Sequence, residues 1–176
     1  MDRSNLIRGK SGADVARGVP KLMPERRHHG ISSKTRGGGI GAKLGVDDDV
    51  FLCLSPGEPW LEHGIVEHRY KELFPAAYLE MINRWGDVSQ GPRRYSVTAF
   101  LTRAWSQLAR DGILATKLGP ATGLYQHNGS ILYWAFPPGP EADRIRTWAD
   151  FAADLGLSPY VWTLPGEPPH HGPSDP

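Results

Sequence analysis

The stretch over residues 95–136 constrains the fold more than any other part of the chain. Its first half carries apolar residues at the spacing of one helix face, namely Val97, Leu101, Ala104 and Leu108. Ser96 is a residue type that caps helix N termini, and Gly112 is one that ends helices. The pattern therefore predicts an amphipathic helix over residues 96–111.

Two β-prone runs follow this helix, at residues 113–118 and 131–136. The segment between them is rich in turn-forming residues, with Gly, Pro and an Asn-Gly pair. Such runs on either side of a turn-rich insert are typical of a β-hairpin with a long tip. We therefore expect a hairpin over residues 113–136.

Other elements are expected on both sides of this core stretch. Residues 50–54 predict a short buried strand, and residues 60–73 and 76–85 have the apolar spacing of two helices. After a proline-rich break, acidic residues begin a last helix over residues 141–155, which is our candidate for homodimer contacts. The expected fold class is α+β: three helices, a hairpin and an extra C-terminal helix.

The composition divides the chain into three parts. Residues 1–45 are rich in Gly, Lys and Arg without any apolar period, which predicts a disordered basic arm. Residues 46–162 form the expected domain, and residues 163–176 a disordered Pro-rich tail. The arm is not a phosphate-binding loop of the Gly-Lys-Ser/Thr type, because Ala42 separates Gly41 from Lys43.

The helix that ends in Arg-Asp-Gly-Ile-Leu and leads into a hairpin resembles the winged helix-turn-helix family. Residues 96–114 and the hairpin at 113–136 carry this resemblance, and the two preceding helices would complete a three-helix bundle. It implies a third helix in the major groove of double-stranded DNA and a hairpin wing beside it. It further implies a transcriptional regulator, often dimeric, without catalytic residues or a cofactor. The segment between Gly86 and Tyr95 is longer than the turn of a compact helix-turn-helix.

Charge is strongly segregated along the chain despite a formal net charge of only +1. Residues 1–45 hold ten Lys/Arg against three Asp/Glu, and residues 90–136 hold five against one. The segments between and after them are acidic. Nucleic-acid binding depends on where positive charge is concentrated, so both basic blocks favour a DNA partner.

The predicted contacts lie on the polar face of the third helix, just before it and on the hairpin. Arg and Gln can read base edges, whereas Ser, Thr and Lys suit phosphates. The expected nucleic-acid-binding residues are Arg93, Arg94, Thr98, Thr102, Arg103, Ser106, Gln107, Arg110, Lys117, Gln126 and His127.

Two other functions remain open. A protein-interaction domain would expose Trp134, Trp148 and Trp162, whereas burial of all three would favour DNA. A metal-dependent nuclease would need the acidic block to converge, with Asp47 or Asp49 near Glu62, His63 or Glu67. We expect no metal site, because His63 and His68 are five positions apart and diverge on a helix.

The sequence predicts no membrane segment. It has neither a long apolar run nor an N-terminal apolar region of the signal-peptide type. The single Cys53 lies in an apolar run and is expected to be a buried, inert thiol. A cytoplasmic location is the expectation that follows.

Overall fold

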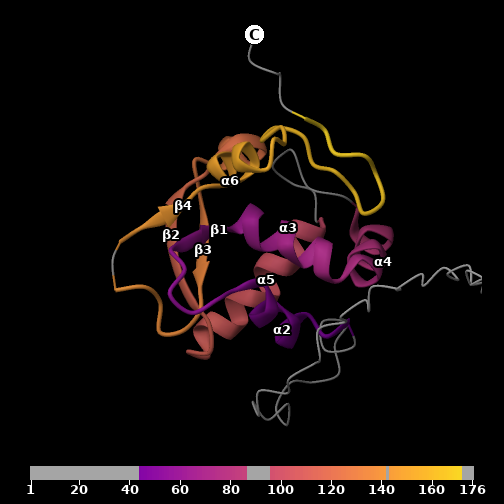
Figure 1. Cartoon of the computed structure of the whole chain (residues 1–176). Coiled ribbons are helices and arrows are strands. Elements are labelled where there is room, and N and C mark those ends of the chain that lie inside the picture. Colours follow the sequence, from indigo (N-terminus) through magenta and orange to yellow (C-terminus); the bar gives the residue numbers. More distant parts are fainter. Residues whose placement is uncertain (1–43, 87–95, 142, 172–176) are drawn as a thin grey trace, which may run out of the picture. The chain divides into compact units, whose positions relative to one another are not determined.

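The computed structural model describes residues 44–86, 96–141 and 143–171, all of which belong to one compact unit. It contains helices and a four-stranded sheet, so the predicted α+β class is confirmed. In Figure 1 the helices α3 (His63–Leu73), α4 (Pro75–Trp85) and α5 (Val97–Arg110) lie to one side of the sheet.

The sheet has the strand order β2-β3-β1-β4. The strands β2 (Ala115–Pro120) and β3 (Ser130–Ala135) are antiparallel and place Thr116 opposite Trp134. This pairing confirms the predicted hairpin. The short strand β1 (Trp60–Glu62) pairs antiparallel with β3, and β4 (Ile145–Arg146) pairs parallel with β1.

The helix α5 has the predicted limits and the predicted cap. The Ser96 hydroxyl accepts a hydrogen bond from the backbone N–H of Ala99, and Gly112 follows the helix with a φ of 70°. A positive φ is a backbone conformation that glycine adopts at little cost, which is why the chain turns there. The buried face contains Val97, Leu101, Trp105 and Leu108, with Trp105 in place of the expected Ala104.

One predicted element upstream of α3 is wrong, and the predicted start of α3 itself is three residues too early. Residues 50–54 are not a strand, because the helix α2 (Val46–Asp49) and the 3₁₀ helix η2 (Val50–Cys53) occupy this region. Val50 and Cys53 are both buried, and their separation of three residues places them on one face of a tight helix. The expected helix at residue 60 begins three residues later, because Leu61 and Glu62 pair with β3.

The C-terminal region also differs from the prediction. The expected helix over residues 141–155 is the strand β4 followed by the short helix α6 (Trp148–Asp154). The apolar side of α6, with Trp148, Phe151 and Ala152, is buried in the domain itself. It is therefore already covered and does not offer the homodimer seam that we expected.

Residues 163–171 contact the domain, whereas the predicted tail was disordered from residue 163 onward. The backbone carbonyl of Thr163 accepts a hydrogen bond from Lys71, and that of His170 accepts one from the backbone N–H of Ser158. Leu157 and His171 form an isolated β-bridge. The chain therefore packs against the domain as far as His171, where the described residues end.

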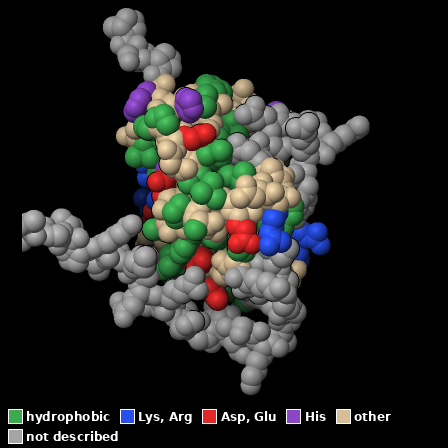
Figure 2. All heavy atoms as spheres, turned by 90° about the vertical axis from the view of Figure 1, so that its right-hand side faces the viewer, with side chains coloured by type: hydrophobic (Ala, Val, Ile, Leu, Met, Phe, Trp, Pro, Cys, Tyr) green, Lys and Arg blue, Asp and Glu red, His purple; other side chains and the backbone are tan. Residues whose placement is uncertain are grey.

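The largest fully buried side chains of the core are aromatic, and Trp105, Trp134 and Trp148 are among them. Figure 2 views the side on which α4 lies in Figure 1, and apolar side chains gather across the middle of this face. Leu73 of α3 and Leu79 of α4 are exposed. None of the described helices combines the length and the apolarity needed to cross a bilayer.

Candidate functional site

The helix α5 presents three polar side chains on one exposed face. Arg103, Gln107 and Arg110 are all exposed, and their spacing places them side by side along the helix. Arg110 donates a hydrogen bond of 2.6 Å to the Gln107 side-chain oxygen, and Gln107 donates one of 2.9 Å to Asp111. This surface offers guanidinium and amide donors, which are the groups that bind phosphates and base edges.

Two of the predicted contact residues on α5 point into the protein instead. The Thr98 hydroxyl donates to Glu67 at 3.1 Å, and the Thr102 hydroxyl lies 3.3 Å from Nε2 of His63. Both hydroxyls therefore satisfy buried polar groups, and we no longer count them as DNA contacts. Ser106 is half-buried on the same helix.

The hairpin tip is only partly available as a wing. Gln126 and His127 are exposed, but Tyr125 is buried, and the backbone N–H of Leu124 donates to the carbonyl of Pro159 at 2.9 Å. The tip therefore lies against the C-terminal segment instead of extending freely into solvent.

Lys117 is the cation of the hairpin itself. It is half-buried, forms an ion pair with Asp143 and lies over the Trp60 ring, 5.4 Å from its centroid. The predicted contacts Arg93 and Arg94 and the basic arm lie outside the described residues.

A polar network lies at the centre of the domain, where α3, α4, α5 and β3 meet. Glu67 is fully buried and accepts hydrogen bonds from the hydroxyls of Tyr78 at 2.8 Å, Thr98 at 3.1 Å and Tyr125 at 3.1 Å. Its other neighbour is His63, one helical turn earlier, with Nε2 at 3.3 Å from the carboxylate. Several hydrogen-bond donors therefore offset the free-energy cost of removing this carboxyl group from water.

The tautomer of His63 follows from its partners. The indole N–H of Trp134 can only donate, and it lies 3.0 Å from Nδ1 of His63. Nδ1 must therefore accept, so the proton of a neutral imidazole is on Nε2 and faces Glu67 and Thr102. The network is consistently paired, and we interpret it as a device that fixes how α3, α5 and the sheet pack.

A second buried carboxylate fixes the hairpin tip to α6. Glu62 accepts hydrogen bonds from the backbone N–H of Thr122 at 2.8 Å, from its hydroxyl at 2.7 Å and from the backbone N–H of Trp148 at 2.6 Å. Burial raises the pKa of Glu62, and the hydrogen bonds from Thr122 and Trp148 oppose that rise. The close packing here also needs Gly64, where an added Cβ would lie 2.7 Å from the Tyr125 ring.

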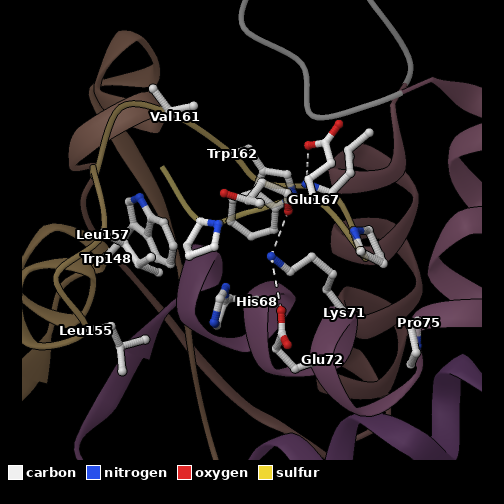
Figure 3. Close-up of a pocket in the computed structure, with 15 residues that line it drawn as sticks. His68, Lys71, Glu72, Pro75, Trp148, Leu155, Leu157, Val161, Trp162 and Glu167 are labelled. Carbon is white, nitrogen blue, oxygen red and sulfur yellow. Dashed lines mark hydrogen bonds and ion pairs between the residues drawn. The ribbon is translucent and has the colours of Figure 1, made fainter. Parts of the chain in front are cut away.

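A pocket of about 530 Å³ lies between α3, α6 and the C-terminal segment. Figure 3 shows Trp148 and Trp162 on its walls and Lys71 between Trp162 and Glu72. The Lys71 ammonium donates to the Thr163 carbonyl at 2.7 Å, lies 3.3 Å from the Glu72 carboxylate and is 5.1 Å from the Trp162 ring centroid. This combination of aromatic walls and a few polar groups is typical of a small-molecule site.

His68 at the pocket is a neutral aromatic side chain near neutral pH. Its ring packs against Trp148, Phe151 and Trp162, with centroids 5.6–6.1 Å apart. Burial and, to a smaller extent, the nearby charge of Lys71 lower the pKa of His68 to about 4.

His68 should therefore make the fold sensitive to acid. Below a pH of about 6.5 the unfolded chain binds a proton at His68 that the folded chain does not bind until about pH 4, so stability falls as pH falls through this window. Between about pH 6.5 and about pH 4, the free energy of unfolding of wild type should fall by about 3 kcal/mol more than that of His68→Phe. Urea denaturation at pH 7 and pH 4 measures this, and equal losses in both proteins would contradict it.

The acidic block does not converge on a metal site. Among residues 44–86, 96–141 and 143–171, no group of three or more His, Cys, Asp or Glu side chains could hold a metal ion. Glu62 and Glu67 are instead bound to hydroxyl and backbone donors. The nuclease alternative therefore has no set of ligands in this part of the chain. Burial raises the pKa of the Cys53 thiol far above its usual range, in keeping with the expected inert thiol.

The protein-interaction hypothesis requires exposed tryptophans, whereas the DNA-binding hypothesis expects the same tryptophans to be buried. Trp134, Trp148 and Trp162 are all buried, so they form no exposed aromatic surface for a protein partner. Comparisons with protein-family models, curated proteins and solved structures found no match to this chain. Function is therefore argued from the site itself.

Proposed function

We propose that this protein binds double-stranded DNA through the exposed face of α5. The observation that carries the proposal is the row of Arg103, Gln107 and Arg110 along that face. Guanidinium and amide groups at this spacing can contact phosphates and base edges of one groove at the same time. By its resemblance to winged helix-turn-helix proteins, the role we assign is transcriptional regulation.

The way in which α5 is held supports this proposal. Its opposite face is fixed in the core by Leu101, Trp105 and Leu108, so the polar row has a defined direction. The hairpin β2–β3 follows directly, which is the element order of the winged-helix interpretation. Residues 90–136 also carry an excess of positive charge, with five Lys/Arg against one acidic residue.

The proposed interface is smaller than the sequence alone indicated. Its centre is Arg103, Gln107 and Arg110, and Thr98 and Thr102 are removed from it. Gln126 and His127 remain as exposed residues of the hairpin tip. Arg93 and Arg94 precede α5 in the sequence. They stay proposed phosphate contacts, because arginine side chains neutralise the charge of DNA phosphates.

The test is binding of the full chain to a duplex of random sequence across a salt series. We expect binding that weakens as salt rises, because each neutralised phosphate releases counterions. Fluorescence anisotropy of a labelled duplex measures the dissociation constant at each salt concentration. An absence of binding at ~20 mM salt would refute the proposal, since electrostatic binding is strongest there.

A further inference from the structure

The pocket between α3, α6 and the C-terminal segment contains an ammonium group, that of Lys71, whose hydrogen bonds are not all used. The Lys71 ammonium has three N–H groups, and the described residues give it two oxygen partners, Thr163 and Glu72. Trp162 lines the same pocket, and its buried indole N–H has no hydrogen-bond partner among the described residues. A ligand that reaches the Lys71 ammonium should therefore supply an acceptor.

The charge of Lys71 is only weakly compensated. Its side chain is 3% exposed, whereas its carboxylate partner Glu72 is 61% exposed and 3.3 Å away. That distance exceeds the usual length of a charge-assisted hydrogen bond, which is about 2.7–2.9 Å. The Thr163 carbonyl is a close polar partner but carries no charge, and an exposed carboxylate such as Glu72 can be replaced by another anion at little cost.

The acidic residues of the pocket limit the charge of the ligand. Glu72 is paired with Lys71, and Glu167 accepts a hydrogen bond from the backbone N–H of Leu164 at 2.9 Å. Both carboxylates would repel a doubly charged anion such as a phosphate. A cationic ligand is disfavoured as well, because the Lys71 ammonium already occupies the face of the Trp162 ring.

The other residues that line the pocket indicate the chemistry of the uncharged part of the ligand. Trp148, Trp162 and the neutral His68 are aromatic, and Leu157 and Pro165 are apolar. The volume of about 530 Å³ is in the range of small-molecule sites. We propose that this pocket binds a small aromatic monocarboxylate, with the carboxylate on Lys71 and the ring against the aromatic wall that Trp148 and Trp162, packed on each other, form together. This binding does not depend on the proposed DNA contact.

Three probes of one shape test the charge. We would titrate the full chain with phenylacetate, phenylacetamide and phenethylamine by isothermal calorimetry, in the absence of DNA. Phenylacetate should bind at least about tenfold more tightly than the other two, because only its carboxylate can compensate Lys71. Equal binding of all three, preference for phenethylamine, or no binding of phenylacetate at millimolar concentration would overturn the proposal.

Two variants test the position of the carboxylate. Lys71→Met should weaken phenylacetate binding by at least about tenfold, whereas Glu72→Gln should strengthen it by roughly threefold by removing the competing carboxylate. Glu80→Gln on α4, at a carboxylate that is 48% exposed and also ion-paired, is the matched control and should leave binding unchanged. If Lys71→Met does not fold, Glu72→Gln still tests the proposal. Weaker or unchanged phenylacetate binding by the Glu72→Gln variant would overturn it.

Discussion

Replacing Arg103 and Arg110 together by glutamate should weaken binding of the full chain to duplex DNA by about 100-fold or more at ~100 mM salt. Each arginine contact with a phosphate or base is worth about 1–3 kcal/mol, and the reversed charges add repulsion. Both side chains are exposed on α5, so the free energy of unfolding should change little. Anisotropy titrations and urea denaturation of the same samples measure the two effects.

The matched control is charge reversal at another exposed arginine. Arg144 directly precedes β4, which is one edge of the sheet. The opposite edge is β2, the strand that follows α5 in the chain. Arg144→Glu changes the net charge by the same amount per residue and should weaken binding by less than about threefold, through long-range electrostatics alone. If Arg144→Glu weakened DNA binding as much as Arg103→Glu or Arg110→Glu alone, net charge and not the α5 surface would determine binding.

Replacing Glu67 by alanine should reduce the free energy of unfolding by about 3–5 kcal/mol. The substitution removes the acceptor for the hydroxyls of Tyr78, Thr98 and Tyr125 and leaves Nε2 of His63 without its carboxylate partner. Buried donors that lose their acceptor bear the full cost of desolvation, and the missing side chain also leaves a cavity. Urea denaturation monitored by circular dichroism measures the change.

Glu80→Ala provides the comparison for this stability prediction. Glu80 lies on α4 and pairs with Arg84 at 2.8 Å, but both side chains are about half exposed. Exposed pairs of this kind contribute about 0.3–0.5 kcal/mol, so its loss should be small. Similar destabilisation by the two substitutions would mean that the buried network around Glu67 does not hold the helices to the sheet.

The elements with strong local signals could be predicted from the sequence. The limits of α5 follow from the Ser96 cap, the apolar stripe and Gly112, and the hairpin follows from two β-prone runs around a turn-rich insert. Residues 50–54 could not be predicted correctly, because a short apolar run does not distinguish a strand from a buried helical turn. The strand at Trp60 and Leu61 could not be predicted either, because it forms through long-range pairing with β3 and β4.

The buried and concave features could not be predicted from local pattern. Thr98 and Thr102 look like members of a solvent-exposed face in the sequence, yet their partners Glu67 and His63 lie more than 30 positions earlier. The pocket joins His68 and Lys71 to Trp148 and Trp162, which only the folded chain brings together. Spacing can indicate which face of a helix is polar, but it does not show which polar groups are needed inside.

The most direct test of the DNA proposal separates α5 from the basic arm. We would compare duplex binding by wild type and by a full-length variant in which the ten Lys/Arg of residues 1–45 are replaced by glutamine. We expect this variant still to bind DNA in a salt-dependent way and to lose that binding when the charges of Arg103 and Arg110 are reversed. Loss of all binding on neutralising the arm, with no further effect of Arg103 and Arg110, would contradict it and make residues 1–45 the DNA-binding element.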